Sequence, residues 1–219
     1  MMSSDLFSRE VDNFTKRTEF LKDSTLKLNE ITNRFIKKRI QKINNDNHSC
    51  KEESLYSGLK KDFNILVKDS PFLTALKKDK KIYKLKTHLK DSVYRDWGFM
   101  DSPAIRGIDL VIPSVFGEVI QVKGIRLGVD KFEHFFSYGY YYFNLHYLGK
   151  KEVKKALKFG LFMEYFNLGA YKSGVMSYGD LAANFNGMRF WNHILAKRKD
   201  PLNQNLGPYV RCRRGKWVF

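Results

Sequence analysis

The sequence predicts one mostly helical α+β domain with a single small β-hairpin. Three observations lead to this class: a balanced composition, helical spacing of apolar residues over most of the chain, and one short region rich in β-branched residues between glycines and prolines. The 219 residues are 43% hydrophobic and 29% charged, which excludes a disordered tail and a disulfide miniprotein. We divide the domain, residues 1–219, into a helical scaffold over 1–95 and a part over 96–219 that carries the candidate site.

Helical spacing dominates the scaffold. Between residues 6 and 43, apolar residues recur every three to seven positions, which predicts one long or two shorter amphipathic helices. The polar run 44–47 ends that pattern. Further helices are expected over residues 54–68, 71–77 and 81–93. Little chemistry is visible in this part of the sequence.

Glycine and proline become frequent after Trp97. Residues 108–112 and 118–127 are rich in β-branched side chains, which favours pairing of the two segments as the β-hairpin. Helical spacing resumes over residues 130–148, 151–168 and 180–196. Residues 209–219 are expected to form a strand or an extended tail.

The chain is strongly basic, with 40 Lys and Arg against 23 Asp and Glu and a net charge of +17 spread over both halves. Such a field attracts polyanions: nucleic acid, an anionic membrane surface, or an anionic bacterial wall. The basic cluster at residues 211–216 carries no recognised reader motif, so we expect no nucleic-acid partner. No window holds 18 consecutive apolar residues, so we expect no membrane span.

Cys50 and Cys212 are the only cysteines. They could be two ordinary thiols or one long-range disulfide in an oxidising compartment, and they exclude a thiolate zinc site. Residues 1–20 contain no apolar signal-peptide core. If the protein is exported, we expect the signal peptide to have been removed from this chain.

Glu164 is an acid in an apolar helix. Over residues 151–168 the predicted inward stripe is Val153, Leu157, Leu161, Glu164 and Leu168, with Gly160 leaving space beside the carboxyl group. Because burial disfavours the charged form, we expect a raised pKa for Glu164, as a general acid near neutral pH requires. The alternative is a structural carboxylate paired with a Lys or Arg of the scaffold.

Glu133 has two interpretations. Asp130 and Glu133 have the spacing of a capping box, in which Glu133 would reach back to the start of its helix. Alternatively, Glu133 begins a polar strip in a segment, residues 132–147, where nine of sixteen residues are aromatic. Such a strip suits a carbohydrate groove, although a tyrosine-rich core explains it equally well; its other members are Ser137, Tyr140 or Tyr141, and Asn144.

His134 could join Asp130 and Asp180 as metal ligands, but no fourth ligand and no HExxH pair is present. We therefore expect no metal. No phosphate-loop, dinucleotide or nucleophile-elbow motif occurs, and no cofactor is expected.

Two stretches resemble the active-site signature of the lysozyme superfamily: residues 163–167, Met-Glu-Tyr-Phe-Asn, and residues 177–184, Ser-Tyr-Gly-Asp-Leu-Ala-Ala-Asn. The resemblance implies that Glu164 is the proton donor and that the second stretch lines the substrate cleft. Ser177 stands where chicken-type enzymes carry their second carboxylate, and we expect Glu133 to supply that group. The pattern is similar to the modified lysozymes that predatory bacteria use against deacetylated peptidoglycan, where Asp180 would face the cationic amine.

A second resemblance covers more of the same region. Asp130-Lys131-x-x-His134, then Glu164, then residues 177–187 as Ser-x-x-Asp-Leu-x-Ala-Asn-x-x-Gly are similar to small bacterial envelope proteins of the YfiM lipoprotein type and, more distantly, to VanZ-like proteins. This resemblance implies an envelope location and a clustering of the acids with His134, without implying a reaction. The two resemblances differ over residues 178–184, which are extended in the first and helical in the second. A helical start would place a capping box at Ser177 and Asp180, with Gly187 allowing close contact with a neighbouring helix.

These observations together predict a lysozyme-like core and a glycoside hydrolase that cleaves the peptidoglycan glycan strand. Glu164 and Glu133 would be catalytic, and the substrate-binding residues would be Tyr140, Tyr141, Asn144, Tyr178, Asp180 and Asn184. The alternative function is a non-catalytic bacterial envelope protein that binds wall or membrane surface. We expect a periplasmic or secreted monomer whose partner is peptidoglycan.

Overall fold

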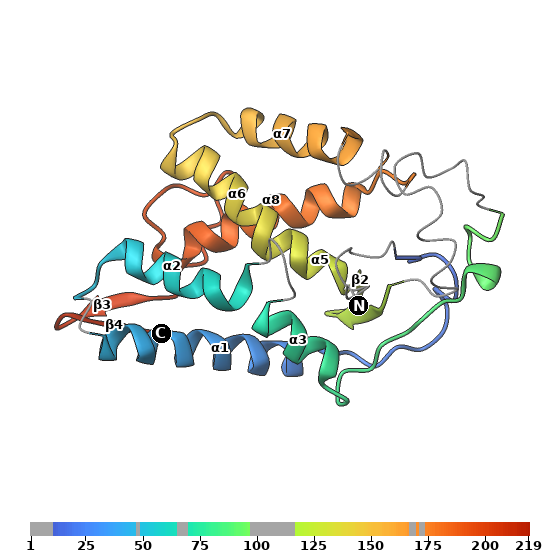
Figure 1. The fold of residues 1–219 in the computed structure, drawn as a ribbon, viewed down its shortest axis with the longest axis horizontal. Helices are drawn as coiled ribbons and strands as arrows, with labels where there is room; N and C mark the ends of the chain where they lie inside the picture. Colours follow the sequence, from blue (N-terminus) through green and yellow to red (C-terminus); the bar gives the residue numbers. More distant parts are fainter. Residues whose placement is uncertain (1–10, 47–48, 65–69, 97–116, 167–169, 171–173) are drawn as a thin grey trace, which may run out of the picture.

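The fold is seen in a computed structural model, which describes residues 11–46, 49–64, 70–96, 117–166, 170 and 174–219 (Figure 1). The described residues are mostly helical, with two small antiparallel hairpins, so the α+β class is confirmed. In the described part of the chain, no helix is both long and apolar enough to cross a bilayer.

The helices form three layers (Figure 1). The first contains α1 (Thr25–Asn45), α2 (Glu52–Phe63) and α3 (Pro71–Lys78). The second contains a long helix, residues 130–148, and α8 (Tyr178–Leu195). The third is α7 (Val153–Phe166) alone, which packs on α8 and on the end of the long helix, on the side away from α1.

The long helix alternates between α- and π-helical turns. It consists of α5 (Asp130–Glu133), η3 (His134–Tyr138), α6 (Gly139–Phe143) and η4 (Asn144–Leu148), of which η3 and η4 are π-helical. Such turns often occur at functional sites. The sequence predicted the span of this helix but not its π-helical turns.

The first hairpin is not the predicted one. β1 (Val119–Val122) pairs with β2 (Ile125–Gly128), so both strands come from the single segment 118–127 and the residue after it. The chain reverses at Lys123 and Gly124, which both have positive φ, as the two-residue turns of hairpins often require. The proposed partner segment, residues 108–112, lies outside the described residues.

The predicted helix over residues 81–93 is also wrong. Only a single turn, η1 (Leu89–Asp91), is helical there. Leu85 instead exchanges two backbone hydrogen bonds with Val119, each 2.9 Å long, so the backbone of this segment is used to extend the edge of the hairpin.

The long helix and α8 cross almost backbone to backbone. A Cβ atom added at Gly139 would lie 2.6 Å from the Cα of Gly187, and one added at Gly187 would lie 1.8 Å from the carbonyl oxygen of Phe135. The predicted close contact at Gly187 is thus confirmed. Next to the crossing, the fully buried Trp191 donates its indole N–H to the carbonyl of Phe136 at 2.9 Å.

The C-terminal tail is a second hairpin, β3 (Arg211–Arg213) with β4 (Lys216–Val218). Asn44 holds it against α1 by hydrogen bonds to both backbone groups of Trp217, each 2.9 Å long. Cys50 and Cys212 form a disulfide across a sequence separation of 162 residues. Of the two alternatives, two thiols or one disulfide, the structure contains the disulfide.

Candidate functional site

Seven polar side chains meet where the start of the long helix, the end of α7 and the start of α8 come together. Five of them are buried, and the other two, Asp130 and Ser177, are partly buried. We call this set the buried polar cluster, and its members are Asp130, Lys131, His134, Glu164, Ser177, Asp180 and Asn184. It contains three of the predicted site residues.

Lys131 is at the centre of the cluster. Its Nζ donates to Oδ2 of Asp130 at 2.6 Å and to Oδ1 of Asp180 at 2.5 Å, and it lies 3.3 Å from Oγ of Ser177. Burial alone would lower the pKa of Lys131, but the two carboxylates more than offset this and raise it. The ammonium is therefore charged and links the long helix to α8.

His134 completes the contacts of Asp180. Its Nε2 lies 3.4 Å from Oδ2 of Asp180, and its Nδ1 lies 3.2 Å from the side-chain amide of Asn184. Burial lowers the pKa of His134 despite the nearby carboxylates, so the imidazole is neutral at pH 7. With the proton on Nε2, on the side of Asp180, Nδ1 is left to accept a hydrogen bond from the side-chain nitrogen of Asn184.

Glu164 enters the cluster from α7. Its side chain is only 3% exposed, and Oε1 accepts a hydrogen bond of 2.9 Å from the backbone N–H of Ser177. Burial raises the pKa of this carboxyl from 4.5 to about 7, against the lowering effect of the Ser177 amide. The raised pKa was predicted from the sequence.

The start of α8 explains why Glu164 binds that amide. Ser177 is the N-cap, and its hydroxyl accepts from the N–H of Asp180, as predicted. In a full capping box the side chain of Asp180 would bind the N–H of Ser177 in return. The carboxylate of Asp180 is instead turned to Lys131 and His134, and Glu164 takes its place.

The predicted capping box at Asp130 and Glu133 is wrong. The N-cap of α5 is Val129, which has helical dihedral angles and makes no side-chain capping hydrogen bond. Asp130 pairs with Lys131 instead. Glu133 is half-buried, and the charges of Glu133 and Glu164 both help burial to raise the pKa of Tyr138 to about 12.

The remaining predicted residues lie outside the cluster. Tyr140 is buried, edge-on to Trp191 at 4.9 Å, and is therefore a core residue. Tyr141 stacks on Phe159 of α7 at 5.6 Å. Asn144 is half-buried farther along the long helix, and Tyr178 is largely exposed at the first residue of α8.

The inward face of α7 differs from the predicted stripe by one position. Ala156, Gly160 and Glu164 face inward, whereas Leu157 and Leu161 are about 40% exposed. Gly160 leaves no open space beside the carboxyl, because a Cβ there would lie 1.4 Å from the hydroxyl of Tyr142. Small residues on α7 thus admit the Tyr142 ring, whereas Leu157, Leu161, Phe162 and Phe166 remain exposed.

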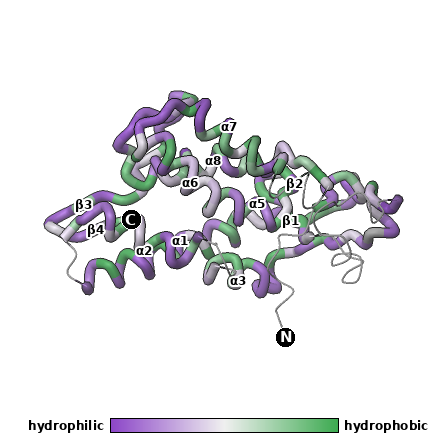
Figure 2. Tube along the Cα trace, turned by 45° about the horizontal axis from the view of Figure 1, so that its top comes forward, coloured by the Kyte–Doolittle hydropathy of each residue, from purple (hydrophilic) through white to green (hydrophobic). Residues whose placement is uncertain are grey.

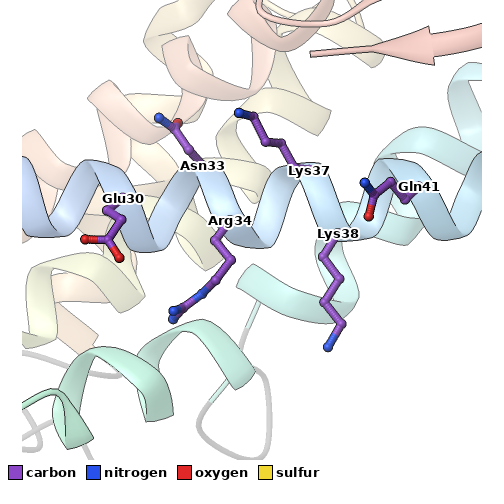
Figure 3. A pocket seen from close by; sticks show the side chains of 6 residues that line it. All are labelled: Glu30, Asn33, Arg34, Lys37, Lys38 and Gln41. Atoms are coloured by element: carbon purple, nitrogen blue, oxygen red, sulfur yellow. The ribbon is translucent and has the colours of Figure 1, made fainter.

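Two of the hollows in the described part of the chain lie outside the cluster. One, of about 490 Å³, is bordered only by polar side chains of α1, which spread apart in different directions (Figure 3). The other, of about 250 Å³, is a groove between α7 and α8. We call it the α7–α8 groove, and it is lined by Tyr142, Lys154, Leu157, Lys158, Leu161 and Leu181.

The possible metal ligands Asp130, His134 and Asp180 do meet, but the ammonium of Lys131 lies between the two carboxylates. Within the described ranges, no three His, Cys, Asp or Glu side chains are placed to hold a metal ion. Lys131 is the residue that reasoning on charge and burial missed. The Asp-Lys-x-x-His motif was the signal that pointed to it.

No family model, curated protein or solved structure matches this chain. The two resemblances stated from the sequence therefore stay predictions. Residues 178–184 are helical, which is the arrangement that the envelope-protein resemblance predicted and differs from the extended stretch of the lysozyme resemblance.

Replacing Lys131 by Met is expected to destabilise the fold by about 3–5 kcal/mol at pH 7, because it leaves buried carboxylates without their counter-charge. The loss should shrink in acid, since burial raises the pKa of Asp130 and a protonated carboxyl needs no cation. Urea unfolding at pH 7 and pH 4 measures the loss of stability at neutral pH and its decrease in acid. The control is Lys197→Met, which removes an exposed pair with Glu52 and should cost less than about 1 kcal/mol. A loss no larger than that of the control would contradict the structural role of Lys131.

Replacing Glu164 by Gln is expected to leave stability unchanged at pH 4 and to raise it at pH 8. The folded-state pKa is raised to about 7. The contribution of the carboxyl to the free energy of unfolding is therefore fully present below pH 4.5 and is lost as pH rises through 7. The gain at pH 8 should approach about 3 kcal/mol, and Gln can still accept from Ser177. The exposed Glu152→Gln should stay within about 0.5 kcal/mol at both pH values. A variant less stable than the parent at pH 8 would refute the raised pKa.

Proposed function

We propose that this chain is a non-catalytic bacterial envelope protein that binds an anionic membrane surface. The observation that carries the proposal is the outer face of α7, where Phe162, Tyr165 and Phe166 are exposed side by side. Phe162 and Phe166 are 58% and 66% exposed and contact each other at 5.2 Å between ring centroids. Contiguous exposed apolar side chains on a basic protein favour an interaction site.

Packing explains why these rings lie outside. The inward positions of α7 are filled by Ala156, Gly160 and Glu164, which leave no room for a larger side chain beneath the helix. The larger apolar residues of α7 therefore lie on its flanks and outer side. An ordinary surface helix has the opposite arrangement, with its apolar stripe inward.

Charge selects the kind of partner. Lys154, Lys155 and Lys158 are exposed on the first half of α7, and Lys150 and Lys151 precede it, with Glu152 as the exposed acid among them. Along its length α7 changes from hydrophilic to hydrophobic (Figure 2). Lysines beside exposed aromatic residues are typical of helices that lie in the interface of an anionic bilayer.

Two further observations support an envelope location. The disulfide between Cys50 and Cys212 suits an oxidising compartment, so we propose a periplasmic or secreted protein. The sequence motifs that resemble envelope proteins coincide with the buried polar cluster, which fixes α7 and α8 to the long helix. In this proposal the cluster is a structural element that holds the outer face of α7 in place.

The purified chain is expected to float with vesicles that contain phosphatidylglycerol, and to bind purely zwitterionic vesicles much more weakly. Replacing Phe162 and Phe166 together by Ser should weaken binding at least about tenfold, because two apolar side chains no longer enter the interface. The matched control replaces Leu202 and Leu206, which are 51% and 65% exposed elsewhere, by Ser. Equal binding by the parent and the α7 variant would contradict the proposal, as would the absence of any anionic preference.

The second candidate is the glycoside hydrolase with a lysozyme-like core that cleaves peptidoglycan. The observation that favours it is Glu164, whose pKa of about 7 is suited to a proton donor. Glu133 would be the second carboxylate. Against it, Glu164 is 3% exposed and already bound to Ser177, and Tyr140 of the expected substrate groove is a core residue.

Release of reducing sugars from purified wall, both acetylated and deacetylated, distinguishes the two candidates. A hydrolase should release sugar, and Glu164→Gln should abolish the release while the exposed Glu152→Gln leaves it unchanged. A parent protein that releases none from either wall would remove this candidate.

A further inference from the structure

We propose that the α7–α8 groove binds part of the acyl chain of a single anionic lipid, with Lys154 and Lys158 holding the headgroup. The inference rests on the proposed membrane function and adds a specific lipid site to it. It is carried by three features of the groove: an apolar wall, two lysines at its edge, and a floor fixed by close packing.

The wall of the groove is apolar and open to solvent. Leu157 and Leu161 are one turn apart on α7 and remain about 40% exposed, although Leu181 of α8 lies across from them. These side chains leave apolar surface in contact with water, which costs free energy until something apolar covers it. The hydrocarbon of an acyl chain is able to cover such apolar surface.

The edge of the groove is cationic. Lys154 and Lys158 are also one turn apart and line the groove together, and no carboxylate lines it. An ammonium group is a compact charge that pairs readily with phosphate or carboxylate oxygens. The pairing of two cations with an apolar wall matches an amphiphile that has an anionic head and a hydrocarbon tail.

The packing of Tyr142 beneath α7 keeps the groove open. Tyr142 projects from the long helix under Gly160. Its hydroxyl lies where the Cβ of any other residue at position 160 would be. Ala156, on the same inward stripe, is fully buried. The distance between α7 and its neighbours is therefore set by these contacts, and the groove persists without a ligand.

The size of the groove limits what it holds. Its volume of about 250 Å³ is smaller than the roughly 300–1,000 Å³ of sites that enclose a drug-sized ligand. The groove therefore holds part of one chain, while the remainder of the lipid stays in the bilayer that the outer face of α7 contacts. Lys154 and Lys158 are then close to the level of the headgroups.

Dodecyl phosphate below its micelle concentration tests the groove without a bilayer. Titration of the full chain, followed by calorimetry, is expected to show saturable binding of one molecule. Inorganic phosphate and dodecyl maltoside should each bind at least tenfold more weakly, because each lacks one of the two parts that the groove recognises. Equal affinity for inorganic phosphate would show a simple anion site and overturn the proposal.

Two variants probe the groove and one serves as the control. Leu161→Trp fills the groove. The double variant Lys154→Gln with Lys158→Gln removes the charge of the groove, and both lysines are exposed, so the fold does not depend on them. Each variant should weaken dodecyl phosphate binding at least tenfold. The Phe162→Ser, Phe166→Ser variant should bind dodecyl phosphate like the parent. Unchanged affinity in both groove variants would overturn the inference.

The outcomes separate this inference from the proposed function. Binding to anionic vesicles without saturable binding of dodecyl phosphate would overturn the groove alone. Binding of dodecyl phosphate without binding to anionic vesicles would support the groove and contradict the membrane function.

Discussion

The orientation of α7 depends on one contact, the hydrogen bond of 2.9 Å from the backbone N–H of Ser177 to the carboxyl of Glu164. This contact brings a polar side chain to the inward face of a helix that is otherwise rich in apolar residues. Tyr142 beneath Gly160 fixes the same face one turn earlier. With the inward positions taken, Phe162, Tyr165 and Phe166 are left on the outside, where the proposed membrane contact lies.

The contact depends in turn on the ion pairs of Lys131. If the carboxylate of Asp180 were free, it could cap the N–H of Ser177 within its own helix. Because Asp180 binds Lys131 and His134, that N–H is available to Glu164. A buried ion pair of this kind contributes little net stability but imposes a specific arrangement, since any other packing leaves a charge without its partner. We infer that the buried polar cluster fixes the relative positions of three helices.

The same geometry separates the two functional candidates. A proton donor needs a raised pKa and also access to a glycosidic oxygen. Glu164 has the raised pKa, since burial raises it to about 7. The same burial covers the carboxyl and so denies it access to a substrate. The outer face of α7 and the α7–α8 groove, in contrast, are accessible and carry the charge that an anionic surface requires.

Local patterns predicted the parts of the fold that depend on neighbours along the chain. The span of the long helix, the N-cap at Ser177 and the close approach at Gly187 were all read from the sequence and are confirmed. Long-range pairing was not predictable in this way. Leu85 became the partner of a strand far along the chain, and the segment around it has one helical turn only.

The candidate site shows the same division. Burial of Glu164 and its raised pKa followed from its apolar surroundings in the sequence. The partner of its carboxyl, the backbone N–H of Ser177, did not follow, because a backbone amide carries no sequence signal and the capping box assigned that N–H to Asp180. The inward face of α7 was missed because apolar spacing favours Leu157 and Leu161, whereas the fit of Tyr142 against Gly160 depends on a neighbouring helix.

The central claim is that α7 presents its aromatic rings to a bilayer, and depth-dependent quenching tests it most directly. Tryptophan is placed at position 166 (Phe166→Trp) and, as a control, at position 206 (Leu206→Trp). The tryptophan fluorescence of each variant is compared with that of the parent chain in anionic vesicles of lipids brominated along the acyl chain. The account predicts that the emission added at position 166 is quenched and shifts to the blue, while that added at position 206 is not. Equal quenching at both positions, or none at position 166 in a protein that is bound to the vesicles, would contradict it.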